Sequence, residues 1–180
     1  MPIKDKNKTL IKFRSNNYEI LNDFLKDVFY KDENLSAPAY ELMRLIYDRK
    51  DLGLSAANWK SYIETVFNTK QVSAEDSAVL DGILNKHNVL NSKRGSKPYE
   101  HLLDLHSKGR LNLNDAEKQV LEKALKWNAC VSSYYSILNK LKAIGLVEKK
   151  QGHYHKSKLI FDRFTQIKSF IEKFETDIRS

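Results

Sequence analysis

The polar side chains of residues 131–160 are of the kinds that bind a polyanion. This segment reads VSSYYSILNKLKAIGLVEKKQGHYHKSKLI and contains six lysines against one glutamate. Lysine ammonium groups bind phosphates, whereas serine, tyrosine and asparagine side chains hydrogen-bond to phosphates or to the edges of bases. The candidate contact residues are Ser132, Ser133, Tyr134, Tyr135, Asn139, Lys140, Lys149, Lys150, His153, His155, Lys156 and Lys158.

The positions of these residues along the chain separate two chemical roles. The group from Ser132 to Lys140 lies in an amphipathic stretch, where Asn139 could bond an adenine through two hydrogen bonds and so read sequence. The lysines and histidines that flank Gln151–Gly152 would instead contact phosphates, which gives affinity and register. The alternative for Tyr134 and Tyr135 is that one of the pair packs inward against Trp127.

The elements that must position these side chains are a helix and a hairpin. Ser132 or Ser133 is expected to cap the helix, and Gly145 follows it at the place where a left-handed residue ends a helix. One strand then leads to a turn at Gln151–Gly152, and the chain returns as a second strand over residues 153–160.

This helix, followed by Ile-Gly-Leu-Val and a basic hairpin, resembles the recognition helix and wing of winged helix-turn-helix DNA-binding domains. The resemblance covers residues 114–160, and residues 98–108 and 114–128 would supply the two preceding helices. It implies a mainly α fold with a small β-hairpin wing, and double-stranded DNA as the partner.

A weaker similarity relates residues 72–97 to the same segment. With a shift of about 57 positions, Leu80 matches Ile137, Leu84 matches Leu141 and Gly95 matches Gly152. A tandem winged-helix protein would follow, with a first, short wing at Ser92, Lys93, Arg94 and Lys97. The alternative is two unrelated amphipathic helices that both end in a hydrophobic pair.

The rest of the chain predicts helices with short connections, because glycine and proline are scarce. Residues 9–14 form a strand or an arm. Helices with apolar side chains at helical spacing are expected over residues 16–30 and over 36–50, with Ser36 as the cap of the second. Further helices are expected over residues 55–67, 73–87 with Ser73 as its cap, 98–108, and 114–128 capped by Asn114. The expected domains are residues 1–97 as a helical domain, 98–160 as the winged helix and 161–180 as a packing or dimerisation helix.

Residues 161–178 carry apolar side chains at alternating spacings of three and four, which is typical of a helix that packs on another helix. We expect a homodimer, because four phenylalanines are a large apolar surface for one such helix. The alternative is that the helix covers the same chain's N-terminal domain. The expected interface residues are Phe164, Ile167, Ile171, Phe174 and Ile178.

Composition excludes several classes of protein. The single cysteine, Cys130, allows no internal disulfide and no four-thiolate zinc site, so we expect a reducing, cytoplasmic location. Residues 1–8 are polar and lysine-rich, no secretory signal is expected, and no apolar run is long enough to span a membrane. The net charge of +8 favours a polyanionic partner.

No catalytic motif accompanies these features. A glycine-rich phosphate loop, a G-x-S-x-G elbow and an H-E-x-x-H pair are all missing, so we expect no enzyme and no cofactor. His153 and His155 with Cys130 or His87 could in principle hold a metal, but contact with phosphate is the favoured interpretation and we expect no metal.

The sequence therefore predicts a dimeric, sequence-specific DNA-binding protein that regulates transcription. Two alternatives remain open. One is a replication-initiation or partition protein of a plasmid or virus, and the other is a winged-helix adaptor that binds proteins and no DNA.

Overall fold

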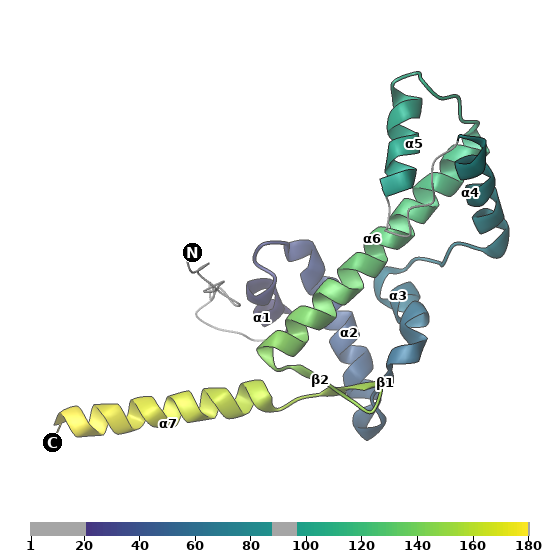
Figure 1. Ribbon diagram of the computed structural model, residues 1–180. Coiled ribbons are helices and arrows are strands. Elements are labelled where there is room, and N and C mark those ends of the chain that lie inside the picture. Colours follow the sequence, from purple (N-terminus) through teal and green to yellow (C-terminus); the bar gives the residue numbers. More distant parts are fainter. Residues whose placement is uncertain (1–20, 88–96, 180) are drawn as a thin grey trace, which may run out of the picture. The chain divides into compact units, whose positions relative to one another are not determined.

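The computed structural model describes residues 21–87 and 97–179, and its helices and strands are drawn in Figure 1. The strand or arm expected at residues 9–14 lies outside the described residues, as do Ser92, Lys93 and Arg94 of the proposed first wing. The described residues are mainly helical, with one small antiparallel sheet. No helix among them is long and apolar enough to cross a membrane.

The chain divides into two compact units. The first unit joins Met1–Trp59 to Tyr135–Ser180, and the second is Lys60–Tyr134. This division cuts across the three segments expected from the sequence, because Leu54–Ser55 and the hairpin share one sheet while the middle of the chain has an apolar core of its own. Each unit is described separately below.

The first unit combines helices from both ends of the chain with the sheet. Its elements are α1 (Leu21–Val28), α2 (Ser36–Asp48), β1 (Leu54–Ser55), the last part of α6 (Asp115–Ile144), β2 (Val147–Lys150), β3 (His153–Lys156) and α7 (Leu159–Arg179). One-turn 3-10 helices at Glu33–Leu35, Lys50–Leu52 and Ala56–Asn58 join the early elements.

Helix α1 packs on α2, and the apolar spacing predicted from the sequence explains why. Leu25 and Val28 on α1, and Leu42, Met43 and Ile46 on α2, are all buried. The prediction that Ser36 caps α2 is wrong. The chain enters the helix through the 3-10 turn, and the Ser36 hydroxyl donates a hydrogen bond of 2.7 Å to the carbonyl oxygen of Glu33.

The sheet has the order β1-β3-β2, and both pairings are antiparallel. The hairpin of β2 and β3 is confirmed, but β3 ends at Lys156 and not at residue 160 as expected. Leu159 and Ile160 instead begin α7, where the Leu159 amide donates to the Ser157 hydroxyl at 3.3 Å. Strand β1 was not predicted at all, because two residues are too short to show an alternating pattern.

The second unit contains α3 (Trp59–Phe67) from Lys60 onward, α4 (Ala74–Lys86), α5 (Lys97–Ser107) and the first part of α6. Its apolar core gathers side chains from α4, α5 and α6 and from the segment before α6. The buried members are Leu80, Ile83, Leu84, Leu102, Leu113, Leu121 and Ala124.

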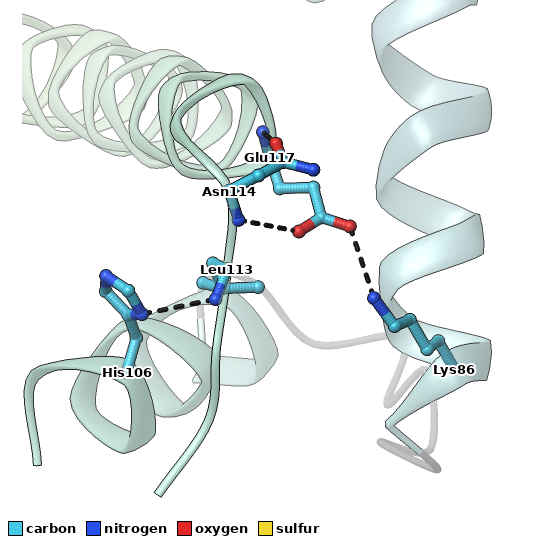
Figure 2. A network of polar contacts seen from close by, with 5 residues as sticks. All are labelled: Lys86, His106, Leu113, Asn114 and Glu117. Atoms are coloured by element: carbon cyan, nitrogen blue, oxygen red, sulfur yellow. Dashed lines mark hydrogen bonds and ion pairs between the residues drawn. The ribbon is translucent and has the colours of Figure 1, made fainter. Parts of the chain in front are cut away.

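Two helix starts in this unit confirm the caps read from the sequence. The Ser73 hydroxyl accepts from the Asp76 amide at 3.0 Å at the start of α4. At the start of α6, Asn114 and Glu117 form a reciprocal capping box, with bonds of 2.8 and 3.0 Å. Figure 2 shows that Glu117 also faces Lys86, at 3.6 Å, and that the neighbouring Leu113 amide donates to His106 Nδ1 at 3.3 Å.

Helix α6 is continuous over 30 residues, so the prediction of two separate helices, one over 114–128 and one that begins at Ser132 or Ser133, is wrong. Neither Ser132 nor Ser133 caps a helix, because both lie well inside α6. The segment between Asn114 and Gly145 contains no glycine or proline. Serine inside a helix costs only a few tenths of a kcal/mol relative to alanine, so two serines do not stop a helix that is capped at both ends.

Candidate nucleic-acid interface

The last ten residues of α6 separate a buried face from a polar, exposed one. Ile137, Leu138, Leu141 and Ile144 are buried as their spacing predicted. Tyr135, Ser136, Asn139 and Lys142 are exposed. Asn139 follows Tyr135 by four residues and Ser136 by three, and Lys142 follows Asn139 by three, so the four form one stripe along the helix. Asn139 lies at its centre.

Lys140 lies beside this stripe and is half-buried. Burial lowers the pKa of its ammonium group, and the positive charge of Lys31 lowers it further. Lys31 comes from the segment after α1, and its Nζ lies 5.6 Å from the centre of the Tyr30 ring. An anion placed near Lys140 would oppose both effects, because it favours the charged form of the amine.

The end of α6 connects the stripe directly to the hairpin. Gly145 has a φ of +82°, and its amide donates to the Lys142 carbonyl at 3.1 Å. The Leu146 amide donates to the Leu141 carbonyl at 3.0 Å, which completes a Schellman motif. Leu146 and Val147 are then buried. The direction in which the hairpin leaves α6 is therefore set by backbone hydrogen bonds and buried side chains.

The hairpin turns through two residues. Gln151 and Gly152 have φ values of +47° and +78°, and positive φ at both central residues is the requirement of a type I′ turn. The register pairs Lys149 with Tyr154 and Lys150 with His153. Since paired residues point to the same side of a sheet, the register assigns each hairpin residue to one of two faces.

The first of these faces carries two lysines beside tyrosine rings, and we call it the tyrosine face. Lys149 Nζ lies 5.6 Å from the centre of the Tyr154 ring, and Lys156 Nζ lies 5.7 Å from that of Tyr47 on α2. Both distances are within the range of a cation–π interaction. Tyr154 and Val147 on this side are buried, whereas both lysines are exposed. The tyrosine face consists of Tyr47, Lys149, Tyr154 and Lys156.

The second face holds Glu148, Lys150, His153 and His155, and we call it the histidine face. Lys150 Nζ forms an ion pair with Glu148 at 2.8 Å. The two imidazole rings are neighbours, with centroids 6.3 Å apart, and both side chains are half-buried. Gly53 lies against this face, since a Cβ atom there would come within 2.7 Å of the His155 ring.

Tyr134 must be removed from the predicted set of contact residues. Its side chain is fully buried, so it cannot reach a base edge, and the inward-packing alternative applies to this member of the pair. Tyr135 is exposed, and its ring centre lies 6.1 Å from that of Trp59. Ser132 and Ser133 belong to the second unit, where Ser132 is exposed and Ser133 is half-buried.

The remaining predicted residues fall in three places. Lys158 is exposed and lies just after β3. Lys97 begins α5, so in the described part of the chain it belongs to a helix and not to a strand of a first wing. Phe164 is exposed on α7, whereas the side chains of Ile167, Ile171, Phe174 and Ile178 on that helix lie outside the described part.

Sequence reasoning missed Ser136, Lys142 and Tyr47. The first two could have been found, because they continue the spacing of Tyr135 and Asn139 on one helical face. Tyr47 could not have been found from local spacing, because it lies more than 100 residues before Lys156 in the sequence. In the described residues, no three histidine, cysteine, aspartate or glutamate side chains lie together as a metal site would require.

The second unit contains an open polar groove of about 650 Å³ between α3 and α6. Lys70, Lys123 and Lys126 contribute positive charge to its lining, and Glu64 contributes negative charge. Lys123 is held by the Asp76 carboxylate, and Glu64 accepts a bond of 3.0 Å from the Gln71 amide. The two carboxylates therefore offset part of the charge of the three lysines.

No protein-family model, curated protein or solved structure matches this chain. The function must therefore be argued from the arrangement of its own residues.

Proposed function

We propose that this protein binds double-stranded DNA in a sequence-specific manner through the first unit and regulates transcription. The observation that carries the proposal is the junction at Gly145. It joins an exposed polar helix face to a hairpin, and the hairpin with the two residues that follow it carries four exposed lysines within ten residues, namely Lys149, Lys150, Lys156 and Lys158. A helix with such a face fits the major groove of DNA, and lysines beside it can contact the flanking phosphates.

The order of elements supports a winged-helix arrangement of the first unit. A helix precedes β1, and α6 leads directly into the β2–β3 hairpin, whose strand β3 lies between β1 and β2. In this proposal residues 135–144 are the reading helix and the hairpin is the wing. The second unit is then an insertion that lengthens the reading helix at its N-terminal end.

The continuous α6 changes which side chains would meet the bases. Base contacts move from the predicted serines to the stripe formed by Tyr135, Ser136, Asn139 and Lys142. Asparagine can bond adenine through two hydrogen bonds, and lysine can bond guanine. The wing lysines would supply contacts that do not depend on sequence.

The deciding experiment is binding of the full chain to a pool of random duplexes at two salt concentrations, followed by sequencing of the retained DNA. Salt-sensitive retention with an enriched motif is the expected result. Retention without enrichment would favour an architectural or partition role, since the protein would then contact only the DNA backbone. An absence of retention at low salt would contradict the proposal and favour the adaptor.

We also propose that α7 forms a homodimer. Phe161 is 55% exposed and Phe164 43% exposed, which leaves apolar surface for a second helix. A dimer would place two reading helices on a palindromic site. Sedimentation of the full chain is expected to give a dimer, and Phe164→Asp should shift it toward monomer. The exposed Leu52→Asp, in a 3-10 turn of the first unit, is the matched control.

A further inference from the structure

The two faces of the wing differ in how their charges are satisfied. On the histidine face, Glu148 lies 2.8 Å from Lys150 and cancels its charge. On the tyrosine face the partners of Lys149 and Lys156 are aromatic rings. A ring attracts an ammonium group through its quadrupole but leaves the net positive charge in place. The tyrosine face is therefore the cationic side of the hairpin.

The rings also restrict where the two ammonium groups lie. A free lysine side chain loses conformational entropy when it binds a phosphate, and prior restriction reduces that loss. Tyr154 restricts Lys149 across the hairpin, and Tyr47 restricts Lys156 from α2. Tyr47 is 42% exposed, so its ring can accompany the lysine at the surface.

We propose that the tyrosine face, and not the histidine face, holds the phosphates of the nucleic-acid backbone, with Tyr47 as a positioning residue from outside the hairpin. This inference rests on the proposed function and adds the side of the wing that meets the ligand. It assigns Lys149 and Lys156 one phosphate contact each. Lys150 belongs to an internal ion pair that gives no contact.

The test measures the affinity of the full chain for a short labelled duplex over a series of salt concentrations. Each phosphate contact contributes about 0.9 to the slope of log affinity against log salt. Lys149→Gln and Lys156→Gln should each flatten the slope by about one. The double variant Glu148→Gln/Lys150→Gln removes the ion pair without changing the net charge and should leave the slope unchanged. Lys108→Gln in the second unit is the control for losing one charge.

Tyr47 is tested by a double-mutant cycle. Tyr47→Ala should weaken binding by about two- to fivefold, the effect of one exposed cation–π contact, whereas Tyr47→Phe keeps the ring and most of the affinity. In a Lys156→Gln background, Tyr47→Ala should have no further effect. A purely structural role would weaken binding equally in both backgrounds.

The outcomes separate this inference from the function on which it rests. If the wild type binds the duplex but Glu148→Gln/Lys150→Gln flattens the slope while Lys149→Gln and Lys156→Gln do not, the face is wrong and the function stands. Additive effects of Tyr47→Ala and Lys156→Gln would remove Tyr47 from its positioning role. A wild type that does not bind the duplex would overturn both proposals.

Discussion

The lysines at the end of α6 and on the hairpin differ in their partners from the ion-paired lysines of the second unit. In the second unit, Lys86, Lys108, Lys118 and Lys123 each have a carboxylate partner. In the first unit, Lys149 and Lys156 lie beside rings, and no carboxylate of the described residues pairs with Lys142 or Lys158. Because exposed ion pairs contribute little to stability, the presence or absence of a carboxylate partner mainly changes the net charge that each region presents to solvent. These four lysines of the second unit have their charge offset by carboxylates, whereas Lys142, Lys149, Lys156 and Lys158 keep charge available for an external anion.

The largest expected effect tests this contrast directly. The triple variant Lys149→Gln/Lys156→Gln/Lys158→Gln should weaken duplex binding on the order of 100-fold at physiological salt, because three phosphate contacts and their released counterions are lost. The matched variant Lys86→Gln/Lys108→Gln/Lys118→Gln removes the same charge from the second unit and should stay close to wild type. Fluorescence anisotropy gives both affinities. Equal losses would show that only total charge matters.

The next effect concerns the helix that both units share. Asn139→Ala should cost about 1–3 kcal/mol of discrimination between the best site and a single-base variant, with the salt slope unchanged. The control is Gln119→Ala, an exposed polar residue in the part of α6 that belongs to the second unit. Competition binding with matched and mismatched duplexes measures the discrimination. If Asn139→Ala instead flattened the slope of log affinity against log salt and left the base discrimination intact, Asn139 would be a phosphate contact and not a base contact.

Two glycines, one in each unit, are expected to change stability in opposite directions when alanine replaces them. Gly145→Ala should destabilise the protein by about 1–2 kcal/mol, because only glycine adopts positive φ at little cost. The new Cβ would also meet the Ile160 amide nitrogen and the Leu159 Cβ at 3.2 Å. Gly82→Ala lies inside α4, where a Cβ meets nothing within 4 Å, and should stabilise by about 0.5–1 kcal/mol. Urea denaturation gives both values, and the same sign for both would contradict the argument.

The smallest effect is a pH dependence in the second unit. The hydrogen bond from Lys123 is the main cause that lowers the pKa of the Asp76 carboxyl below its ordinary value. A carboxyl whose pKa falls on folding stabilises the protein above its unfolded pKa of about 3.9, and that contribution is lost as pH falls through the folded value. Asp76→Asn should therefore be slightly less stable than wild type at neutral pH, with the difference vanishing in acid. Urea midpoints across this range measure it, and a constant difference would assign the effect to the Ser73 cap.

The amino-acid sequence by itself determined the local features. Apolar spacing indicated the buried faces of α1, α2 and the last part of α6, and the types of Ser73, Asn114 and Gly145 indicated where helices begin or end. Gln151–Gly152 placed the hairpin turn. Each of these depends on hydrogen bonds or contacts within a few residues, which is why neighbouring residue types were sufficient to predict them.

Tertiary structure alone decided the rest. Serine is favoured at caps and costs little inside helices, so only the folded chain shows α6 running past Ser132 and burying Tyr134. The pairing of β1 with β3, and the position of Tyr47 beside Lys156, join residues about 100 positions apart. Such contacts depend on how whole elements pack, and no local pattern specifies them. For that reason the sequence predicted a basic wing, while only the fold showed which of its lysines are paired and which face remains cationic.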